Sequence, residues 1–273
     1  MKKPKVGEIF CKSALVKSNI PGVDYALNPY LGCEHGCVYC YASFMQRYYH
    51  QNETWGEFVD VKTNFVEKLR AQIKRTKPGL VYFSSVTDPY QPLEEKCKLT
   101  RRCLETLAEV NFPVSIQTKS DLVLRDLDIL KEIKDSEVGF TITTLDEKIR
   151  EKFEPHASPL SQRFRALELL NKNKISTFAF FGPVLPYFSD NKKTIRSMLK
   201  KLSATGVGRV YMDKMNYKGR NWGRISKLLL KDFPDIFRYY LWTKQSQELY
   251  SIKLKDTISE CIQGLSLNAE VVF

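Results

Sequence analysis

Six short apolar runs recur along the chain, and longer segments with helical spacing separate them. Short apolar runs bounded by turn residues are consistent with buried strands. The runs that we interpret as strands cover residues 25–31, 80–85, 114–118, 138–143, 175–181 and 207–213. Each is therefore a candidate element of one sheet.

Two of the intervening segments carry clear helix signals. The segment 194–204 places four apolar side chains on one helical face: Ile195, Met198, Leu199 and Leu202. Gly206 follows it as a stop signal. The segment 100–110 has a similar apolar face, and Thr100 is its candidate N-terminal cap.

Strands that alternate with helices predict right-handed βαβ units and a mainly parallel sheet. Six units are compatible with a partial barrel or with an open doubly wound sheet, and in both folds ligands bind at the carboxyl ends of the strands. We expect an N-terminal extension over residues 1–24, the α/β unit over 25–236, and a C-terminal extension over 237–273 that packs on the barrel.

Composition adds charge and compartment to this picture. The 273 residues carry a formal net charge of +12, which favours polyanionic partners such as nucleic acid without identifying one. The most apolar stretch, residues 178–188, contains Gly182, Pro183 and Pro186, so we expect no membrane span. Seven cysteines without an export signal indicate a reducing environment, and we expect a cytoplasmic protein. The oligomeric state is left open.

Three of the cysteines lie in the run NPYLGCEHGCVYCYA, at Cys33, Cys37 and Cys40, directly after the first expected strand. Gly32 and Gly36 free the backbone to wrap around an inorganic group. Soft thiolates suit an iron–sulfur cluster or zinc. Three thiolates can bind three irons of a four-iron cubane, and the fourth iron then stays open to the amino and carboxylate groups of a small molecule.

Two other interpretations remain for these cysteines. A structural zinc site would need a fourth ligand, for which His35 and His50 are the candidates, and zinc would suit a nucleic-acid-binding module without catalysis. An iron–sulfur protein that only transfers electrons is the second. We see no convincing second ligand pair for zinc, because Cys97 and Cys103 are widely spaced and Cys103 fits a helix core.

The CxxxCxxC loop, with Tyr39 before its last cysteine, resembles the signature of the radical S-adenosyl-L-methionine (SAM) superfamily. The segments 84–94, 117–120, 141–146 and 154–163 are similar to its spore photoproduct lyase-related branch, and the resemblance covers about residues 25–190. It implies a partial (β/α)6 TIM-like barrel, a [4Fe-4S] cluster and SAM. It further implies reductive cleavage of SAM to a 5′-deoxyadenosyl radical, an external flavodoxin- or ferredoxin-type electron donor, and a nucleic-acid base lesion as one candidate substrate.

The resemblance also implies roles for individual residues at the cofactors. Tyr39 would lie against the adenine of SAM. Thr87 and Asp88 would bind its amino group, and Lys119 its carboxylate. Thr141 matches a small hydroxyl residue of the branch.

Three further positions follow from the same resemblance. Arg163 would reach the ribose or the carboxylate, unless it is a solvated surface residue. Val184, with Pro183, would form an apolar wall for the adenine. Tyr41 matches a tyrosine of the hydrogen-transfer relay in spore photoproduct lyase and is the candidate catalytic residue.

The sequence departs from that branch at the hydrogen donor. The lyase has a cysteine after its second strand, and the matching position here is Ser85, whose O–H bond is too strong to donate a hydrogen atom readily. Cys97 lies downstream and fits a buried structural thiol better than a substitute donor. A lesion-wedging hairpin near the C-terminus is also not evident. A modified nucleotide, a peptide or a small metabolite therefore stays open as the substrate.

The last candidate feature is a basic stretch over residues 213–231. It interleaves five cations with two aromatic residues: Lys214, Lys218, Arg220, Arg224, Lys227, Tyr217 and Trp222. Cations that meet phosphates and rings that stack on bases are typical of a nucleic-acid surface. A solvated helix face explains the same pattern.

Overall fold

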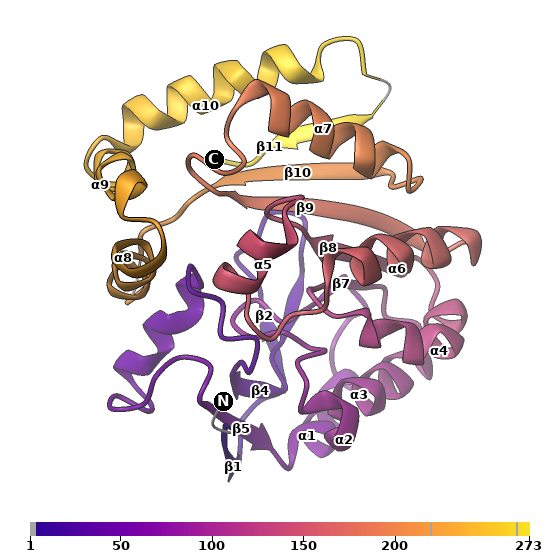
Figure 1. Ribbon diagram of the computed structural model, residues 1–273. Coiled ribbons are helices and arrows are strands. Elements are labelled where there is room, and N and C mark those ends of the chain that lie inside the picture. The colour runs from indigo at the N-terminus through magenta and orange to yellow at the C-terminus, as the bar shows by residue number, and fades with distance from the viewer. Residues whose placement is uncertain (1–3, 219, 266) are drawn as a thin grey trace.

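The computed structural model describes residues 4–218, 220–265 and 267–273. Its main element is an eight-stranded sheet that curves through the middle of the molecule (Figure 1). In spatial order the strands are β2 (Leu15–Lys17), β3 (Tyr25–Leu27), β6 (Val81–Phe83), β7 (Val114–Thr118), β8 (Glu137–Thr141), β9 (Ser176–Val184), β10 (Arg209–Lys214) and β11 (Asn268–Val271). All neighbouring strands are parallel except β2, which is antiparallel to β3. The strands β3 and β6–β10 confirm the expected parallel architecture of a partial TIM-like barrel.

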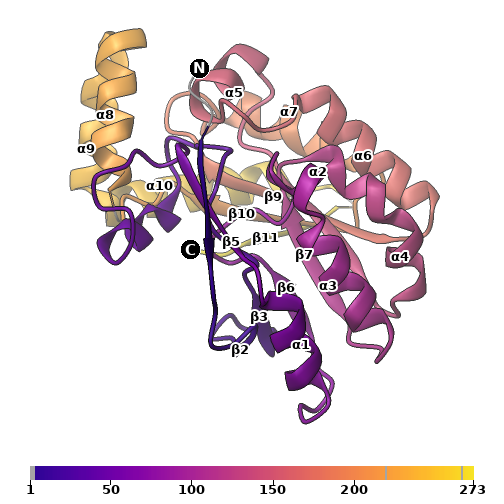
Figure 2. The ribbon, with the colours of Figure 1, turned by 90° about the horizontal axis from the view of Figure 1, so that it is seen from below.

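Helices cover the convex face of this sheet and bury most of the core between the two layers (Figure 2). The covering helices are α1 (Phe65–Ile73), α3 (Leu99–Ala108), α4 (Leu127–Glu132), α6 (Leu160–Lys172) and α7 (Lys192–Ser203). Shorter elements connect them: α2 (Glu94–Cys97), α5 (Glu147–Phe153), and the 3₁₀ helices η1 (Tyr41–Arg47) and η2 (Asp121–Asp126). The alternation of strand and helix follows the hydrophobic pattern of the sequence.

The helix signals hold for α7, but the expected cap of α3 is wrong. The four apolar residues expected on one face of α7 are all fully buried, and the Asn191 side chain accepts a hydrogen bond from Thr194 N at its start. At α3, Glu94 Oε2 accepts from the backbone amides of Leu99 and Thr100, each at 2.9 Å. A carboxylate from the preceding helix thus caps α3, because Thr100 instead donates its hydroxyl to Pro89 O.

The first expected strand is divided in two. Asn28 and Pro29 end β3, and the chain then enters β4 (Tyr30–Gly32), which belongs to a second sheet of order β1–β5–β4. The partners of β4 are β5 (Phe58–Lys62) and, beyond it, β1 (Lys5–Ile9). The break occurs here because proline lacks the amide that a continuous strand would need, and the Asn28 side chain bonds Val86 N and Ser85 Oγ after β6.

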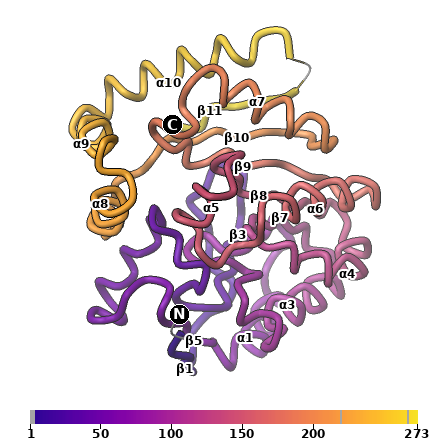
Figure 3. The backbone as a smooth tube through the Cα atoms, in the orientation of Figure 1, coloured from indigo at the N-terminus to yellow at the C-terminus, as the bar shows by residue number. Residues whose placement is uncertain are grey.

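After β10 the chain forms a helical segment before it returns to the sheet. It comprises α8 (Asn221–Asp232), η3 (Pro234–Ile236), α9 (Phe237–Gln245) and α10 (Gln247–Ile262), and it ends in β11 beside β10. In Figure 3, α10 runs over α7, and α8 and α9 lie at the side of the molecule that also holds the segment after the cysteines. No described helix is long and apolar enough to cross a membrane.

Candidate active site

The cysteine loop, residues 33–40, leaves β4 at a point where only glycine fits. Gly32 has φ +86°, and a Cβ there would lie 2.5 Å from Phe58 O. A second close approach joins the loop to residue 56, since a Cβ on Gly56 would lie 2.7 Å from the Cα of Gly36. Backbone bonds from Val38 N to Phe153 O and from Cys40 N to Cys37 O complete the fold of the loop. The thiols are therefore held by backbone packing.

Cys33, Cys37 and Cys40 line one cavity of about 150 Å³, and none of them forms a disulfide. Burial raises the pKa of Cys37 to about 12 and raises those of Cys33 and Cys40 as well. Thiolates at these positions therefore need a compensating positive centre. Trp55 also lines the cavity, and its buried indole Nε1 has no hydrogen-bond partner among the described residues. Three convergent thiols fit a cubane with one open corner.

Both histidines proposed for a zinc site lie beside a carboxylate. His35 is buried, and its Nδ1 lies 3.3 Å from Asp88 Oδ2. His50 Nε2 lies 2.7 Å from Asp60 Oδ2. Among the described residues, no group of three or more histidine, cysteine or acidic side chains is arranged to hold a single metal ion. A cubane requires wider thiolate spacing than a single ion, so the three cysteines remain suited to it.

Asp88 is the electrostatic anchor of the cavity wall. Its carboxylate accepts from Thr118 Oγ1 at 2.6 Å, from Lys119 N at 3.0 Å and from Tyr90 N at 2.9 Å. Burial would raise the pKa of Asp88, but His35, Lys119 and Thr118 outweigh it and lower the pKa to about 2. The group is therefore a permanent negative charge that ties the loops after β6 and β7 together.

Thr87, the neighbour of Asp88, holds the start of the cysteine loop. Its hydroxyl donates to Gly32 O at 2.5 Å and accepts from Gln91 Nε2 at 3.1 Å. Gln91 Oε1 in turn accepts from Glu34 N at 2.8 Å. Thr87 thus lines the cavity, and it also fixes the loop that carries the cysteines.

Behind the cysteines lies a buried group that the sequence did not reveal, centred on Glu154. Its carboxylate accepts a short hydrogen bond from Tyr39 Oη and a second from Thr143 Oγ1 at 3.0 Å. It also forms an ion pair with Arg163, with Nη2 at 2.5 Å from Oε2. Burial would raise the pKa of Glu154, but Arg163 and Lys119 outweigh it and lower the pKa. The Lys119 ammonium lies 6.0 Å from the centre of the Tyr39 ring. Glu154 thereby orients the Tyr39 ring through the hydrogen bond to its hydroxyl, and it places a negative charge beside that hydroxyl.

A second cavity of about 370 Å³ adjoins the first and shares six lining residues with it: Cys40, Tyr41, Tyr82, Gln117, Lys119 and Thr141. The Tyr41 hydroxyl donates to Ser85 O, so the predicted relay tyrosine and the position matching the lyase cysteine are in contact. Tyr41 is 46% exposed, and partial desolvation at the cavity wall raises its pKa to about 12. A row of hydrogen bonds runs from Tyr82 Oη to Gln117 Oε1 and from Gln117 Nε2 to Thr141 Oγ1.

Asp213, at the carboxyl end of β10, also lines the second cavity. Its side chain has no ion-pair partner among the described residues, and burial raises its pKa to about 6. Lys214 lines the same cavity, but its ammonium donates to Ser251 Oγ. The sequence analysis did not select Asp213. It is the last residue of the sixth expected strand, and the rule that sites lie at the carboxyl ends of strands could have identified it.

The structure brings most of the predicted residues together around the two cavities. The exceptions are Arg163 and Val184, which are fully buried and line neither cavity. Arg163 donates to Thr141 O and Ser158 O besides its ion pair, so it is no surface residue. The N–H donors of Arg163 already face protein acceptors, so Arg163 is not available to bind SAM directly. It influences Tyr39 only through its ion pair with Glu154. Cys97 also lies away from both cavities, and it packs at the edge of the main core.

Much of the basic stretch over residues 213–231 is used inside the protein. Trp222 stacks on Phe237, with ring centres 6.2 Å apart, and Tyr217 Oη bonds Thr243 Oγ1. Arg224 donates to Cys40 O at 3.1 Å. The prediction that these two rings form a stacking surface for bases is therefore wrong, because both serve to pack α8 and α9.

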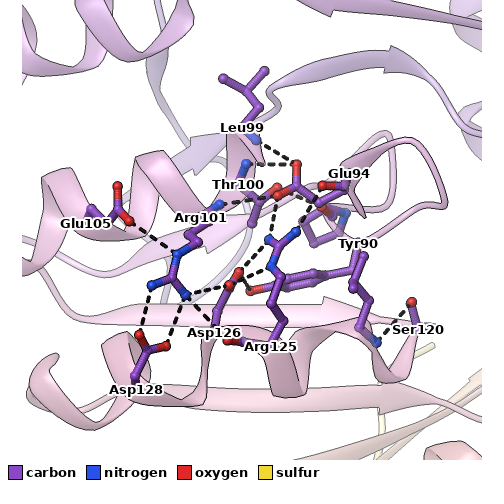
Figure 4. A network of polar contacts seen from close by, with 12 residues as sticks. Tyr90, Glu94, Leu99, Thr100, Arg101, Glu105, Ser120, Arg125, Asp126 and Asp128 are labelled. Carbon is purple, nitrogen blue, oxygen red and sulfur yellow. Dashed lines mark hydrogen bonds and ion pairs between the residues drawn. The ribbon is translucent and has the colours of Figure 1, made fainter. Parts of the chain in front are cut away.

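A network of charged side chains from α2, α3, α4 and η2 lies close to Tyr90 (Figure 4). We call it the Glu94 network; its charged members are Glu94, Arg101, Arg125, Asp126 and Asp128. Arg125 pairs with Glu94 and Asp126, both at 2.7 Å, and Arg101 joins Asp126 to Asp128. Tyr90 Oη donates to Asp126 at 3.1 Å, which connects the network to Asp88 two residues earlier.

An open parallel barrel with three cysteines and a cavity at the carboxyl ends of its strands defines a class of iron–sulfur enzyme. The sequence model described as "Radical SAM superfamily" matches residues 27–202. The chain belongs to this superfamily. It is an enzyme whose cofactors are a [4Fe-4S] cluster and SAM.

The chain is also similar to other proteins in sequence and to solved structures in fold. An uncharacterized protein of Methanocaldococcus jannaschii, MJ0683, is 38% identical, and the match covers 69% of this chain and 71% of that protein. A protein of Pseudomonas phage M6 named radical SAM Nalpha-GlyT isomerase is 26% identical over 77% of this chain and 45% of its own. A spore photoproduct lyase mutant superposes with a TM-score of 0.72 at 14% identity, covering 97% of this chain and 80% of that one. Another lyase mutant, with bound AdoMet and dinucleoside spore photoproduct, gives 0.68 at 16% identity, with coverage of 97% and 80%.

Proposed function

We propose that this enzyme cleaves SAM reductively and uses the 5′-deoxyadenosyl radical to abstract hydrogen from a nucleic-acid base. The observation that carries the first part is the convergence of three thiols, two of them on buried residues, on a cavity that continues into a second one. When bound, the cofactors supply the electron and the radical. The protein contributes binding, orientation and exclusion of water.

The described residues suggest how SAM is held. Cys33, Cys37 and Cys40 would bind the cluster. Lys119, which lines both cavities, would pair with the carboxylate of SAM. Burial would lower the pKa of Lys119, but Cys37 and Glu154 outweigh it, so its cation persists.

The other predicted contacts fall on opposite walls of the cavities. Asp88 and Thr87 would serve the amino end of SAM; the hydrogen bonds of the Asp88 carboxylate are already taken, so we assign it an effect of charge. Tyr39, held by Glu154, would lie against the adenine. Val184 would support the adenine wall from behind Pro183, which lines the second cavity.

The second cavity is the proposed place of the substrate. Tyr41 is our candidate for the group that returns a hydrogen atom, since Ser85 stands where the lyase has its cysteine. The contact of its hydroxyl with Ser85 O gives the phenol a neighbouring acceptor. A nucleic-acid substrate is supported by the net charge of +12 and by the exposed Lys218 and Arg220 of the β10–α8 connection. A ferredoxin- or flavodoxin-type donor would supply electrons from outside.

The test is anaerobic reconstitution followed by product analysis. We expect iron and sulfide near four per chain, a paramagnetic signal that changes when SAM is added, and 5′-deoxyadenosine after reduction with dithionite. One zinc per chain, or a cluster signal indifferent to SAM, would contradict the proposal. Deuterium-labelled thymine-rich DNA then tests the substrate, because label should move into deoxyadenosine. Transfer from a labelled peptide or metabolite alone would exclude the nucleic-acid part.

A further inference from the structure

Helix α8 lies outside the residues matched by the superfamily model, yet two of its side chains reach the cysteine loop. Asn221 Nδ2 donates to Tyr39 O at 2.9 Å, and Arg224 Nη2 donates to Cys40 O at 3.1 Å. The residues joined are more than 180 positions apart in sequence. Two neighbouring carbonyls of the loop are therefore held by one helix.

Arg224 has further donors that no described residue satisfies. Its Nε and Nη1 atoms are buried, and neither has a hydrogen-bond partner in the described part of the chain. Leaving a buried donor unpaired destabilises the folded protein, and more so when the group is charged. A guanidinium cannot avoid this cost by losing its proton. Such donors indicate that an acceptor other than the described residues belongs beside them.

The surroundings specify the chemistry of that acceptor. The backbone oxygen that Arg224 already binds belongs to Cys40, one of the three cluster cysteines. Burial lowers the pKa of Arg224, and Cys40 and Cys37 act against that effect. Arg224 lines neither cavity of the site, so it meets the cysteine loop from outside the cavity. The acceptor that a bound cluster would add there is the thiolate sulfur of Cys40, the residue whose carbonyl Arg224 already binds.

We propose that Arg224 donates N–H hydrogen bonds to the sulfur atoms of the cluster site and thereby raises the reduction potential of the cluster. This inference rests on the proposed function. Reduction adds one electron to a site that already holds three thiolates. A fixed cation and hydrogen bonds to sulfur stabilise the added charge, and both are known determinants of cluster potentials. Arg224 acts as a positioning and tuning residue, and Asn221 keeps α8 in place.

The experiment is a redox titration of the reconstituted protein, followed by the paramagnetic signal of the reduced cluster. Arg224→Gln should make the cluster about tenfold harder to reduce, which is a shift of ~59 mV to more negative potential for a one-electron couple. Arg224→Lys keeps the charge and loses the forked donors, so it should fall between. Lys227→Gln is the matched control, because it removes one positive charge from the exposed side of the same helix and should leave the potential unchanged.

A second measurement covers the case in which the Arg224 variants fail to load the cluster. In the unmodified protein, arginine labelled with ¹⁵N in the guanidino group should give a nitrogen coupling in the pulsed paramagnetic spectrum of the reduced cluster. Equal potentials in the loaded Arg224→Gln variant, or the absence of that coupling, would overturn the inference. Failure of the proposed function is distinct, since the unmodified protein would then show no SAM-dependent cluster signal.

Discussion

Two regions of this molecule contain buried charged groups, and they differ in whether these groups have partners. In the Glu94 network each charge meets an opposite charge, and Glu94 and Asp126 are fully buried with their oxygens occupied. Around the cysteine loop, Arg224 keeps two unpaired donors and Asp213 has no ion-pair partner among the described residues. The network stabilises the chain by itself, whereas the loop region is complete only with additional groups.

This difference separates scaffold from site without reference to any relative. Satisfied networks hold a fold, while unsatisfied buried groups lower stability and persist where ligands complete them. The comparison makes four predictions, which distinguish effects on the cofactor site from effects on the scaffold.

The largest effect should come from the cysteines. Cys33→Ala, Cys37→Ala and Cys40→Ala should each reduce deoxyadenosine formation to background, because each removes one of the three proposed ligands of the cluster. Iron content and product analysis measure this. Cys97→Ala is the control and should retain activity, since Cys97 lies away from both cavities. Turnover in any of the first three variants would refute the ligand assignment.

Next is the scaffold. Glu94→Gln should lower the free energy of unfolding by about 1–3 kcal/mol, because Arg125 loses one of its two buried carboxylate partners and keeps only Asp126. Denaturant unfolding monitored by circular dichroism measures the change. Deoxyadenosine formation per folded, cluster-loaded protein should stay near that of the unmodified enzyme. A selective loss of activity would mean that the network belongs to the site.

A smaller effect on the site is expected from the group behind Tyr39. Glu154→Gln removes the charge that pairs with Arg163, and SAM affinity should fall about 10-fold or more, by analogy with the loss of affinity when the hydrogen-bond partner of a metal ligand is removed. Tyr39→Phe keeps the ring and removes only its hydroxyl, so it should show part of this loss. Equilibrium binding of SAM to the oxidised, loaded protein is the measurement. Unchanged affinity in Glu154→Gln would show that Glu154 serves stability alone.

The smallest effect concerns Asp213 and has the opposite sign. Its pKa is raised to about 6 in the folded protein from an ordinary value of 3.8, so the folded state holds more protons between these values. Stability therefore falls as pH rises through this window. Asp213→Asn should stabilise the protein by about 1–2 kcal/mol at pH 7.5 and have no such effect below about pH 4. Thermal unfolding at both pH values checks this, and equal gains at both would contradict the assignment.

The sequence was a good guide where information is local. The six parallel strands, the face of α7 and the three cysteines all follow from spacing within a few residues. The β1–β5–β4 sheet was missed because its strands pair across more than 20 residues, and Pro29 divides a run that looks continuous.

The sequence predicted mainly those site residues that belong to the motifs of the superfamily and its branch. Glu154 carries no distinguishing pattern, and its role comes from contacts with Tyr39 and Arg163 that exist only after folding. Arg224 was assigned to a basic surface, since charge patterning does not reveal that a cation will be buried against a cysteine carbonyl. Asp213 could have been found from its place at the end of a strand.

The bond from α8 to the cysteine loop has a consequence for recombining relatives of this enzyme. An exchange of segments at the boundary of the superfamily match, after residue 202, would join a cysteine loop from one protein to an α8 from another. The carbonyls of Tyr39 and Cys40 would then accept their hydrogen bonds only if the helix from the other protein placed an amide and a guanidinium at the same positions as Asn221 and Arg224. The cysteine loop and α8 must therefore come from the same parent protein in such an exchange, although a long stretch of chain lies between them.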